Sequence, residues 1–389
     1  MRIGIDVTCW PNVRGYGRFT RELVTAMTKI PGEDEFVLFI DRTSAVDALR
    51  FLPHCTVVEV ETRVAPSKAA SAAGSRTPAD VLRMSAAVYR HRPDAFFFPT
   101  VYSWFPLPLG VPSVVTIHDA IAERFPSIVV PGFRARTLWR LKLALAIRQA
   151  RRILTVSEYA REDIARIHSI PLDSIAVAVE APAAVYHPST AEEAASEVRK
   201  LGVDPADGWF VYVGGMSPHK NVPNLVRCFS RLAAELDRPP ALILAGPVED
   251  DVFHGEHETV MREIIAGGVE DLVKWAGYVA DESLRRIFSG ALALVLPSRC
   301  EGFGLPAVEA AACGAPAIAT TESPLPTLLD GGGIFVRPGD DDGLYRAMRE
   351  LATDGEMRAT MGARALDCAR RLSWDVAARA ALDTIRGAV

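Results

Sequence analysis

The chain has 389 residues, of which 49% are hydrophobic and 23% charged, and its formal net charge is -5 at pH 7. This length exceeds what a single hydrophobic core usually serves, so the sequence predicts two domains. The composition is that of an ordinary globular protein, and the negative charge argues against a general nucleic-acid binder.

Short apolar runs alternate with longer stretches of helical period, a pattern typical of parallel α/β layers. Each run is short and strongly apolar, as buried parallel strands are. In the first half, strands are predicted at residues 3–7, 36–40, 56–60, 95–98, 113–117, 153–156 and 175–179. In the second half, they are predicted at residues 210–213, 242–245, 272–275, 291–296, 315–320 and 333–336. Helices are predicted at residues 18–27, 224–236, 281–288 and 342–352.

The boundary between the two halves is predicted at residues 181–190, which contain two prolines and several small residues. The predicted domains are therefore residues 1–185 and 186–373. Ser373, which precedes a final stretch of helical period, is a candidate N-cap residue.

Two stretches depart from the alternation. Residues 61–78 are small, polar and proline-containing, which predicts a mobile loop. Residues 133–152 carry seven basic side chains among leucines and alanines. Two interpretations stay open for this second stretch: a helix that contacts a membrane surface or an acidic partner, and a surface helix whose apolar stripe packs on the first domain.

Cysteine usage and the N-terminal segment favour a cytoplasmic protein. The six cysteines are scattered and include no CxxC pair, which fits reduced thiols better than disulfides or a zinc site. Asp6 interrupts the first apolar run, unlike a signal peptide, and no stretch reaches the ~18 uninterrupted apolar residues of a spanning helix.

Residues 296–314 carry the strongest chemical signal of the chain. A strand ends here, a glycine-containing turn follows at residues 301–306, and a short predicted helix ends before Gly314. Glycine lets the backbone approach a ligand closely, and the N–H groups at a helix start favour an anion such as phosphate. Two carboxylates, Glu301 and Glu309, flank this turn. A phosphate site with carboxylates for hydroxyl groups indicates a sugar-nucleotide site.

These two glutamates, in an EGFGLPxxEA setting, resemble the EX7E pair of the retaining glycosyltransferases of family 4. Segments 15–23, 116–119, 153–158 and 212–221 agree with that family in the expected order. The resemblance covers nearly the whole chain and implies the α/β fold called GT-B: two Rossmann-like domains whose parallel sheets face each other across a cleft. It also implies that residues 374–389 form a helix that completes the first domain.

For the second domain, the resemblance implies a donor-binding role. Lys220 matches the lysine that binds the donor diphosphate, and it lies in a loop that begins at Gly214 and Gly215. Glu309 matches the glutamate that binds the ribose hydroxyls, and Glu301 matches the one that contacts the transferred sugar. The turn that would donate backbone N–H groups to the leaving diphosphate consists of Gly302, Phe303, Gly304 and Leu305.

One feature of this loop departs from the family. Related enzymes often place an arginine near the lysine, whereas this chain has Gly215 and His219 at the two corresponding positions. A protonated His219 or the nearby Arg299 is a candidate for the second cation.

For the first domain, the resemblance implies that His118 hydrogen-bonds the donor sugar from the acceptor side. Gly17 and Arg18 match the N-terminal loop that closes over the donor phosphates. Tyr16 and Asp119 are the candidates for contact with the acceptor.

The implied reaction moves a hexose from a GDP- or UDP-sugar to a hydroxyl group of a glycan, a glycolipid or a natural product in a bacterium. The resemblance favours a mannose donor and a front-face reaction with retention of configuration. Alternatives are a synthase or phosphorylase of the same fold and a catalytically silent sugar-nucleotide-binding scaffold. A monomer and a homodimer both fit the sequence.

Neither a cofactor nor a metal is expected. The acidic segments 249–251 and 340–342 have the composition of solvated turns, and the histidines of segment 254–257 are too isolated for a zinc site.

Overall fold

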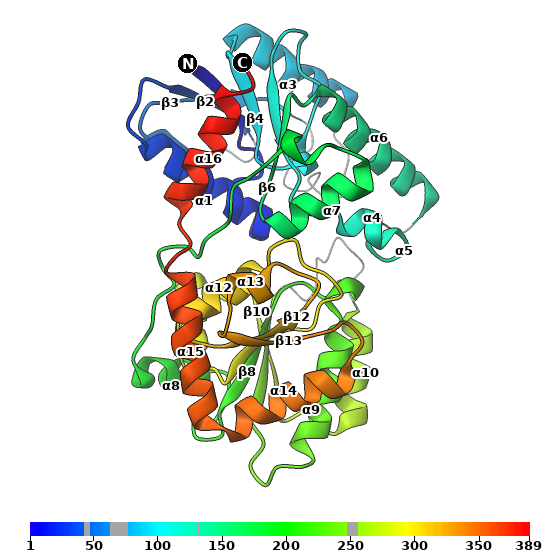
Figure 1. The fold of residues 1–389 in the computed structure, drawn as a ribbon, viewed down its shortest axis with the longest axis vertical. Helices are drawn as coiled ribbons and strands as arrows, with labels where there is room; N and C mark the ends of the chain where they lie inside the picture. Colours follow the sequence, from blue (N-terminus) through cyan, green and yellow to red (C-terminus); the bar gives the residue numbers. More distant parts are fainter. Residues whose placement is uncertain (43–46, 63–76, 131, 247–255) are drawn as a thin grey trace. The chain divides into compact units, whose positions relative to one another are not determined.

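The computed structural model describes residues 1–42, 47–62, 77–130, 132–246 and 256–389. Most of the loop predicted at residues 61–78, all of segment 249–251 and the first half of segment 254–257 lie outside the described residues. The chain divides into two compact units, which Figure 1 shows as ribbons. Unit 1 comprises Met1–Glu180 and Ser373–Val389, and unit 2 comprises Ala181–Leu372.

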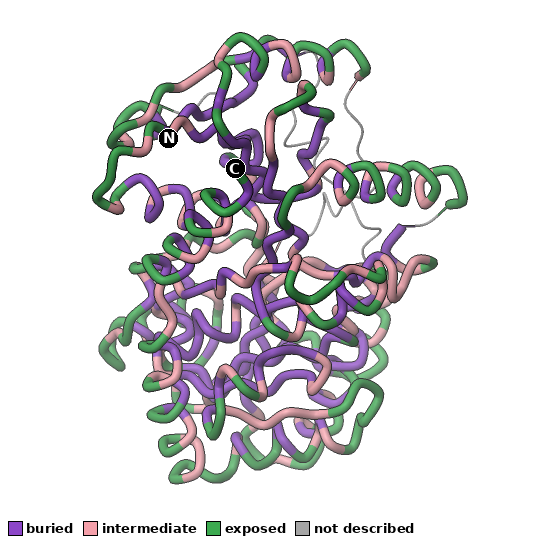
Figure 2. The backbone as a smooth tube through the Cα atoms, turned by 45° about the horizontal axis from the view of Figure 1, so that its top comes forward, coloured by how far each residue is buried: buried purple, intermediate pink, exposed green. Residues whose placement is uncertain are grey.

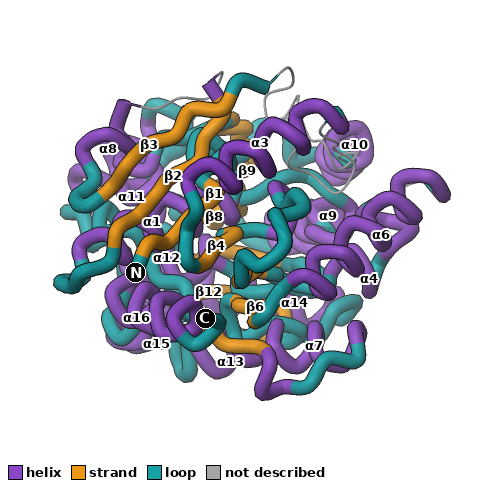
Figure 3. The backbone as a smooth tube through the Cα atoms, turned by 90° about the horizontal axis from the view of Figure 1, so that it is seen from above, coloured by secondary structure: helices purple, strands orange, loops and turns teal. Residues whose placement is uncertain are grey.

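Unit 1 contains a parallel seven-stranded sheet in the order β3-β2-β1-β4-β5-β6-β7. Four of these strands, β3, β2, β1 and β4, are seen side by side in Figure 3. The strand order reverses between β1 and β4, the kind of switch point beside which open α/β sheets bind ligands. The strands are β1 (Arg2–Asp6), β2 (Glu35–Asp41), β3 (Cys55–Val60), β4 (Ala95–Phe98), β5 (Ser113–Thr116), β6 (Arg152–Thr155) and β7 (Ile175–Val177).

The helices of unit 1 cover this sheet because each buries one apolar face. They are α1 (Gly15–Lys29), α3 (Pro78–His91), α4 (Ile121–Arg124), α5 (Pro126–Val129), α6 (Phe133–Gln149), α7 (Glu158–His168) and α16 (Trp374–Arg386). Short 3-10 turns lie at η2 (Asp47–Phe51), η3 (Val101–Ser103) and η4 (Leu172–Ser174).

The C-terminal helix α16 belongs to unit 1, where it packs against α1 and β7 (Figure 1). The Ser373 hydroxyl accepts a hydrogen bond from the Asp375 N–H at 3.2 Å, which confirms the predicted N-cap. Near the other end of the helix, Arg386 forms an ion pair with Asp34 at 2.7 Å. The last residues of the chain therefore complete the first half of the sequence rather than the second.

Unit 2 contains a parallel six-stranded sheet in the order β10-β9-β8-β11-β12-β13, with a reversal between β8 and β11. Its strands are β8 (Trp209–Val213), β9 (Ala241–Ala245), β10 (Val273–Gly277), β11 (Ala293–Leu296), β12 (Ala317–Thr320) and β13 (Gly333–Val336). Its helices are α8 (Ala191–Arg199), α9 (Val222–Ala233), α10 (His257–Gly267), α11 (Asp281–Ser289), α12 (Leu305–Ala312), α13 (Leu325–Leu328), α14 (Asp341–Thr353) and α15 (Gly355–Ala369), and a 3-10 turn, η5, spans Pro218–Lys220.

The strands predicted in both halves are present, with ends that shift by at most two residues. Their side chains form the cores of the two units. Figure 2 colours the backbone by burial and marks these stretches as buried. This agreement has a simple physical cause: a parallel strand buried on both faces is an uninterrupted apolar run in the sequence.

Helix α6 is a surface helix with an apolar stripe packed on unit 1, as one of the two interpretations predicted, but not all of its leucines belong to that stripe. The side chains that it buries are Trp139, Leu143 and Ala146. Leu138, Leu141 and Leu145 are exposed by 63%, 55% and 44%. Trp139 fixes the inward face, because its indole N–H donates to Glu123 Oε1 at 2.6 Å and its ring stacks on Tyr102. Among the described residues, no helix is both long enough and apolar enough to cross a membrane.

Candidate active site

The loop after β8 presents Lys220 at the carboxyl edge of the sheet of unit 2. The Tyr212 hydroxyl donates to the carbonyl oxygen of Gly215 at 2.5 Å and so holds the start of this loop. The loop then forms η5, in which the Lys220 N–H donates to the Ser217 carbonyl at 2.8 Å. Asn221 follows with a φ of 58° and donates from its side chain to the Pro297 carbonyl at 3.3 Å. The lysine is thus held between β8 and the end of the neighbouring strand β11.

Lys220 meets the first glutamate of the predicted pair. Its Nζ donates to Glu301 Oε1 at 2.7 Å, and the Ser298 hydroxyl donates to the same oxygen at 2.6 Å. Burial of Glu301 disfavours its charge, but the attraction of Lys220 and the hydrogen bonds from Lys220 and Ser298 outweigh burial and hold the pKa of this carboxyl below its usual value. Glu301 is therefore an ionised group at neutral pH, fixed by two donors.

The turn after Glu301 leads directly into helix α12. Gly304 has a φ of 89°, and a Cβ atom there would lie 2.7 Å from Leu325 Cδ1, so both the backbone and the space require glycine. Pro306 lies in the first turn of α12, where a backbone N–H would have no partner within the helix. Proline, which lacks this N–H, therefore costs no hydrogen bond there. The backbone of Gly302, Phe303, Gly304 and Leu305 therefore approaches the helix N-terminus, whose dipole favours an anion.

Glu309 is buried within α12, whose other residues are apolar. A carboxylate in such a helix is unusual, because burying a charge without a polar function is unfavourable. Glu309 and the Lys220–Glu301 pair thus belong to the same sheet edge: α12 follows β11, and β11 pairs with β8.

The two candidates for a second cation lie on adjoining segments. The Arg299 N–H donates to the carbonyl oxygen of His219 at 2.8 Å. His219 is buried and contributes a favourable charge interaction to Glu301, whereas the Arg299 side chain is exposed. Both residues therefore lie next to Lys220, and both stay candidates for the second cation.

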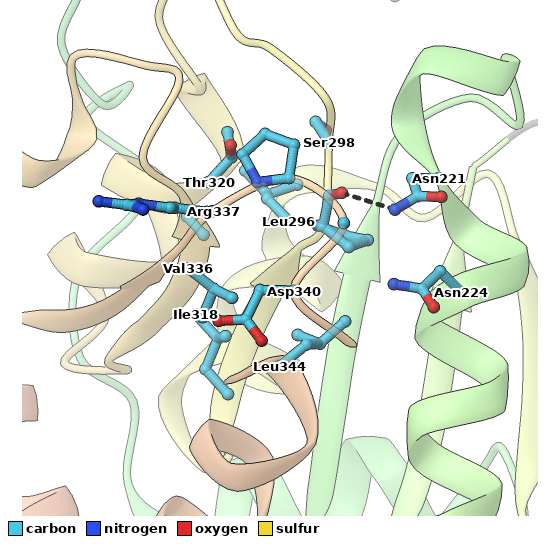
Figure 4. Close-up of a pocket in the computed structure, with 14 residues that line it drawn as sticks. Asn221, Asn224, Leu296, Ser298, Ile318, Thr320, Val336, Arg337, Asp340 and Leu344 are labelled. Atoms are coloured by element: carbon cyan, nitrogen blue, oxygen red, sulfur yellow. Dashed lines mark hydrogen bonds between the residues drawn. The ribbon is translucent and has the colours of Figure 1, made fainter. Parts of the chain in front are cut away.

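A small pocket lies at the carboxyl ends of β11, β12 and β13 (Figure 4). Asn221 and Asn224 line it from one side, and Arg337 and Asp340 line it from the loop after β13. Ser298 lines this pocket and also donates to Glu301, so the pocket adjoins the Lys220–Glu301 pair. Sequence reasoning missed Ser298 as a site residue, although it lies in the segment that carries the glutamate pair.

In unit 1, His118 follows β5 and is held on three sides. Its Nε2 lies 2.9 Å from the Pro99 carbonyl oxygen, which can only accept, so Nε2 carries a hydrogen. Its Nδ1 lies 3.6 Å from Glu180 Oε1. The Phe19 ring packs edge-on against the imidazole, with the ring centroids 4.7 Å apart. Both ring nitrogens of the predicted sugar-contacting histidine are thus engaged by unit 1.

Glu180, which sequence reasoning did not select, is the buried partner of this ring. Burial raises the pKa of the Glu180 carboxyl, and the hydrogen bond and charge of His118 only partly oppose that effect. The neighbouring Asp119 adds to the rise and Arg18 works against it. Glu180, which was not predicted, thus interacts with three residues that were: His118, Arg18 and Asp119. No sequence signal marked Glu180, because it follows an apolar strand and belongs to no motif.

The N-terminal residues of α1 form the remaining part of the predicted site in unit 1. The Asn12 side chain donates to the Tyr16 hydroxyl at 2.9 Å, and the Tyr16 and Tyr102 rings lie 5.3 Å apart. A Cβ atom on Gly17 would lie 2.0 Å from the Asn12 carbonyl oxygen, so glycine is needed for this close approach. Asp119 Oδ1 accepts from the Ile121 N–H at 3.0 Å and starts α4. Each unit thus assembles its own group of predicted residues.

Comparison with known proteins identifies the family. The family model described as Glycosyl transferases group 1 matches residues 194–367, and the model described as Glycosyltransferase Family 4 matches residues 13–178. O-antigen chain mannosyltransferase B of Escherichia coli is 30% identical over 264 residues, which are 68% of this chain and 67% of that protein. O-antigen chain mannosyltransferase RfbU of Salmonella typhimurium is 23% identical over 63% of this chain and 62% of its own length.

Solved structures share the fold at lower identity. Sucrose-phosphate synthase of Thermosynechococcus elongatus has a TM-score of 0.79 and 18% identity, covering 100% of this chain and 98% of that one. Anabaena HepE, solved in complex with UDP and glucose, has a TM-score of 0.74 and 17% identity, with all of both chains covered. The chain therefore belongs to the family 4 glycosyltransferases, is a transferase, and has the GT-B fold predicted from its sequence.

Proposed function

We propose that this glycosyltransferase moves a hexose from a nucleoside-diphosphate sugar to an acceptor hydroxyl group, with retention of configuration. The observation that carries the proposal is the ion pair of Lys220 with Glu301, beside the glycine turn that begins α12. A positive side chain, a helix N-terminus and two buried carboxylates are the groups that a sugar diphosphate needs. The mannosyltransferase relatives favour a mannose donor, and the UDP-bound HepE supports a nucleotide-sugar donor.

In this proposal, the residues of unit 2 act on the leaving group. As the bond between the anomeric carbon and the phosphate oxygen breaks, negative charge grows on the diphosphate. Lys220 and the N–H groups of the turn at residues 302–305 stabilise that charge, and Glu309 binds the ribose. The acceptor oxygen forms the new bond on the same face of the sugar, and its proton passes to the leaving phosphate. We further propose that the transfer needs no metal, because Lys220 and the helix dipole supply the positive charge.

The acceptor class that we propose is a glycan, a glycolipid or a natural product. The relatives named for O-antigen chains favour the first two of these. We assign Tyr16 and Asp119 of unit 1 to the acceptor, and His118 to the donor sugar.

We also propose that α6 contacts an anionic membrane surface. The helix Phe133–Gln149 contains five basic residues and no acidic one. Its exposed leucines, Leu138, Leu141 and Leu145, recur at helical spacing on one face, and Phe133 is exposed at its start. An apolar stripe flanked by arginines is complementary to lipid tails and anionic headgroups. Such contact would bring the enzyme to a lipid-linked acceptor.

A panel of nucleotides and nucleotide sugars tests the donor assignment. We expect one of UDP, GDP, dTDP or ADP, or a conjugate of it, to raise the melting temperature without added metal. A ligand at 100 times its Kd stabilises the fold by about 2.7 kcal/mol, which is easily detected. The selected donor should then be hydrolysed slowly in the absence of acceptor. Binding without any hydrolysis or transfer would instead favour the alternative of a silent sugar-nucleotide-binding scaffold.

A further inference from the structure

We propose that Glu180 is a positioning residue that holds the His118 imidazole in one orientation for sugar transfer. The proposal rests on the proposed function for the role of His118, and on the geometry of unit 1 for the role of Glu180.

Three separate elements of unit 1 fix the ring. The Pro99 carbonyl, just after β4, takes the Nε2 hydrogen at 2.9 Å. The Phe19 ring on α1 closes one side, and it is itself backed by Trp374 of α16, at a centroid distance of 5.9 Å. Glu180, after β7, faces the remaining nitrogen, Nδ1, at 3.6 Å. The Pro99 carbonyl thus settles which nitrogen carries the hydrogen, and Glu180 is the group that faces the other nitrogen.

Burial gives the Glu180–His118 contact its strength. Glu180 is 4% exposed, so water screens its carboxylate poorly. A buried carboxylate is stable when a partner compensates its charge, either as an ion pair with a protonated imidazole or by sharing a proton with Nδ1. The other charged groups that act on Glu180 are Arg18 on α1 and Asp119 after β5, and their effects oppose each other. His118 is therefore the partner that settles the charge of Glu180.

The position of Glu180 in the chain adds a second consequence. It is the last residue of the first segment of unit 1, and Ala181 begins unit 2. The contact with His118 therefore also fastens the segment through which the chain leaves the first unit. A loss of this contact would release both the ring and that segment.

The test compares Glu180→Gln with the matched control Glu123→Gln in the full-length chain. Glu123 is another largely buried carboxyl of unit 1 whose pKa is raised by burial, and it accepts from Trp139 rather than from His118. Glutamine keeps the shape of both side chains but replaces the carboxyl by an amide, with an NH2 donor in place of one acceptor oxygen. Nitrogen NMR signals of His118 report the surroundings of its two ring nitrogens separately. Steady-state kinetics report kcat and the KM for the donor.

We expect Glu180→Gln to change the chemical shift of His118 Nδ1, because the group that faces this nitrogen changes from a carboxyl to an amide. We expect kcat to fall roughly ten- to a hundredfold through misplacement of the ring, with a smaller change in the donor KM. Glu180→Asp should recover part of both effects, and Glu123→Gln should show neither. Melting temperatures of the variants establish that they fold, and Glu180→Met, which has a similar volume and no carboxyl, replaces the glutamine variant if that one does not.

An unchanged Nδ1 signal in Glu180→Gln would overturn the proposed pairing. A changed Nδ1 signal with an unchanged kcat would overturn the positioning role. If the wild-type chain turned over no donor at all, the proposed function would fail, and the histidine signals would show separately whether the pair exists.

Discussion

Lys220 and Glu301, 81 positions apart in the chain, are joined by a hydrogen bond of 2.7 Å between Nζ and Oε1. They meet because β8 and β11 are neighbours in the sheet of unit 2 and each strand ends in the loop that carries one of the two residues. The strand order reverses between these two strands. The ion pair thus lies at the switch point where open α/β sheets bind their ligands.

Replacement of Lys220 tests its role in leaving-group stabilisation. We expect Lys220→Ala to lower kcat by about 10²–10³-fold, because a fixed positive donor to the developing charge is removed. Lys200→Ala is the control, since Lys200 is an exposed lysine whose ion pair, with the buried Glu197 of α8, lies outside the predicted site. Kinetics with the selected donor measure both. Equal kcat values for the two variants would remove Lys220 from the mechanism.

Replacement of Glu309 should affect binding more than turnover. We expect Glu309→Ala to weaken nucleotide binding by about 1–3 kcal/mol through the lost ribose hydrogen bonds. Calorimetric titration with the nucleoside diphosphate measures the change, and Glu309→Gln tests whether the charge or the acceptor oxygen matters. A nucleotide affinity equal to that of the wild-type chain would contradict the ribose assignment.

Glu301 gives unit 2 a stability that depends on pH. Its folded-state pKa lies below the usual value, so its stabilisation is present above the unfolded pKa, about 4.3, and is lost as pH falls through the folded value. We expect wild type to exceed Glu301→Gln in unfolding free energy at neutral pH, with the difference shrinking below about pH 4.3. Urea unfolding at several pH values measures it. A difference independent of pH would mean that the carboxyl is not ionised in the folded chain.

Gly304 and Gly314 form a matched pair for testing the turn before α12. Both have positive φ angles, 89° and 86°, but a Cβ atom meets Leu325 only at Gly304 and meets nothing within 4 Å at Gly314. We expect Gly304→Ala to destabilise by about 2–4 kcal/mol and Gly314→Ala by about 1 kcal/mol. Gly304→Ala should also weaken donor binding. Equal losses of stability in the two variants would mean that Leu325 moves away from the new Cβ atom at little cost in free energy.

The proposed contact of the exposed α6 leucines with a membrane can be tested without an enzyme assay. We expect replacement of Leu138, Leu141 and Leu145 by serine to reduce sedimentation with vesicles rich in anionic lipid, because the apolar contact is lost. Ile265→Ser, on the exposed face of α10, is the control. Wild-type binding should also weaken with salt. If wild type and the triple variant sediment equally, α6 is not the contact surface.

The sequence by itself determined the strands, the predicted N-cap at Ser373 and the turn with its two glutamates. These features are local: an apolar run, a capping serine or a glycine before a helix has the same physical consequence wherever the segment lies. The family motifs also named Lys220, Glu301 and His118 one by one.

Only the tertiary structure decided which of these residues touch. The contact of Lys220 with Glu301 depends on the adjacency of β8 and β11, and the addition of Ser298 depends on how the chain leaves β11. Glu180 became the partner of His118 because β5 and β7 both pair with β6 and end at the same edge of the sheet. The outward leucines of α6 became visible because Trp139 fixed the inward face. Residues far apart in the chain meet only after strand order is set, and helical period alone does not choose the buried side when both sides carry leucines.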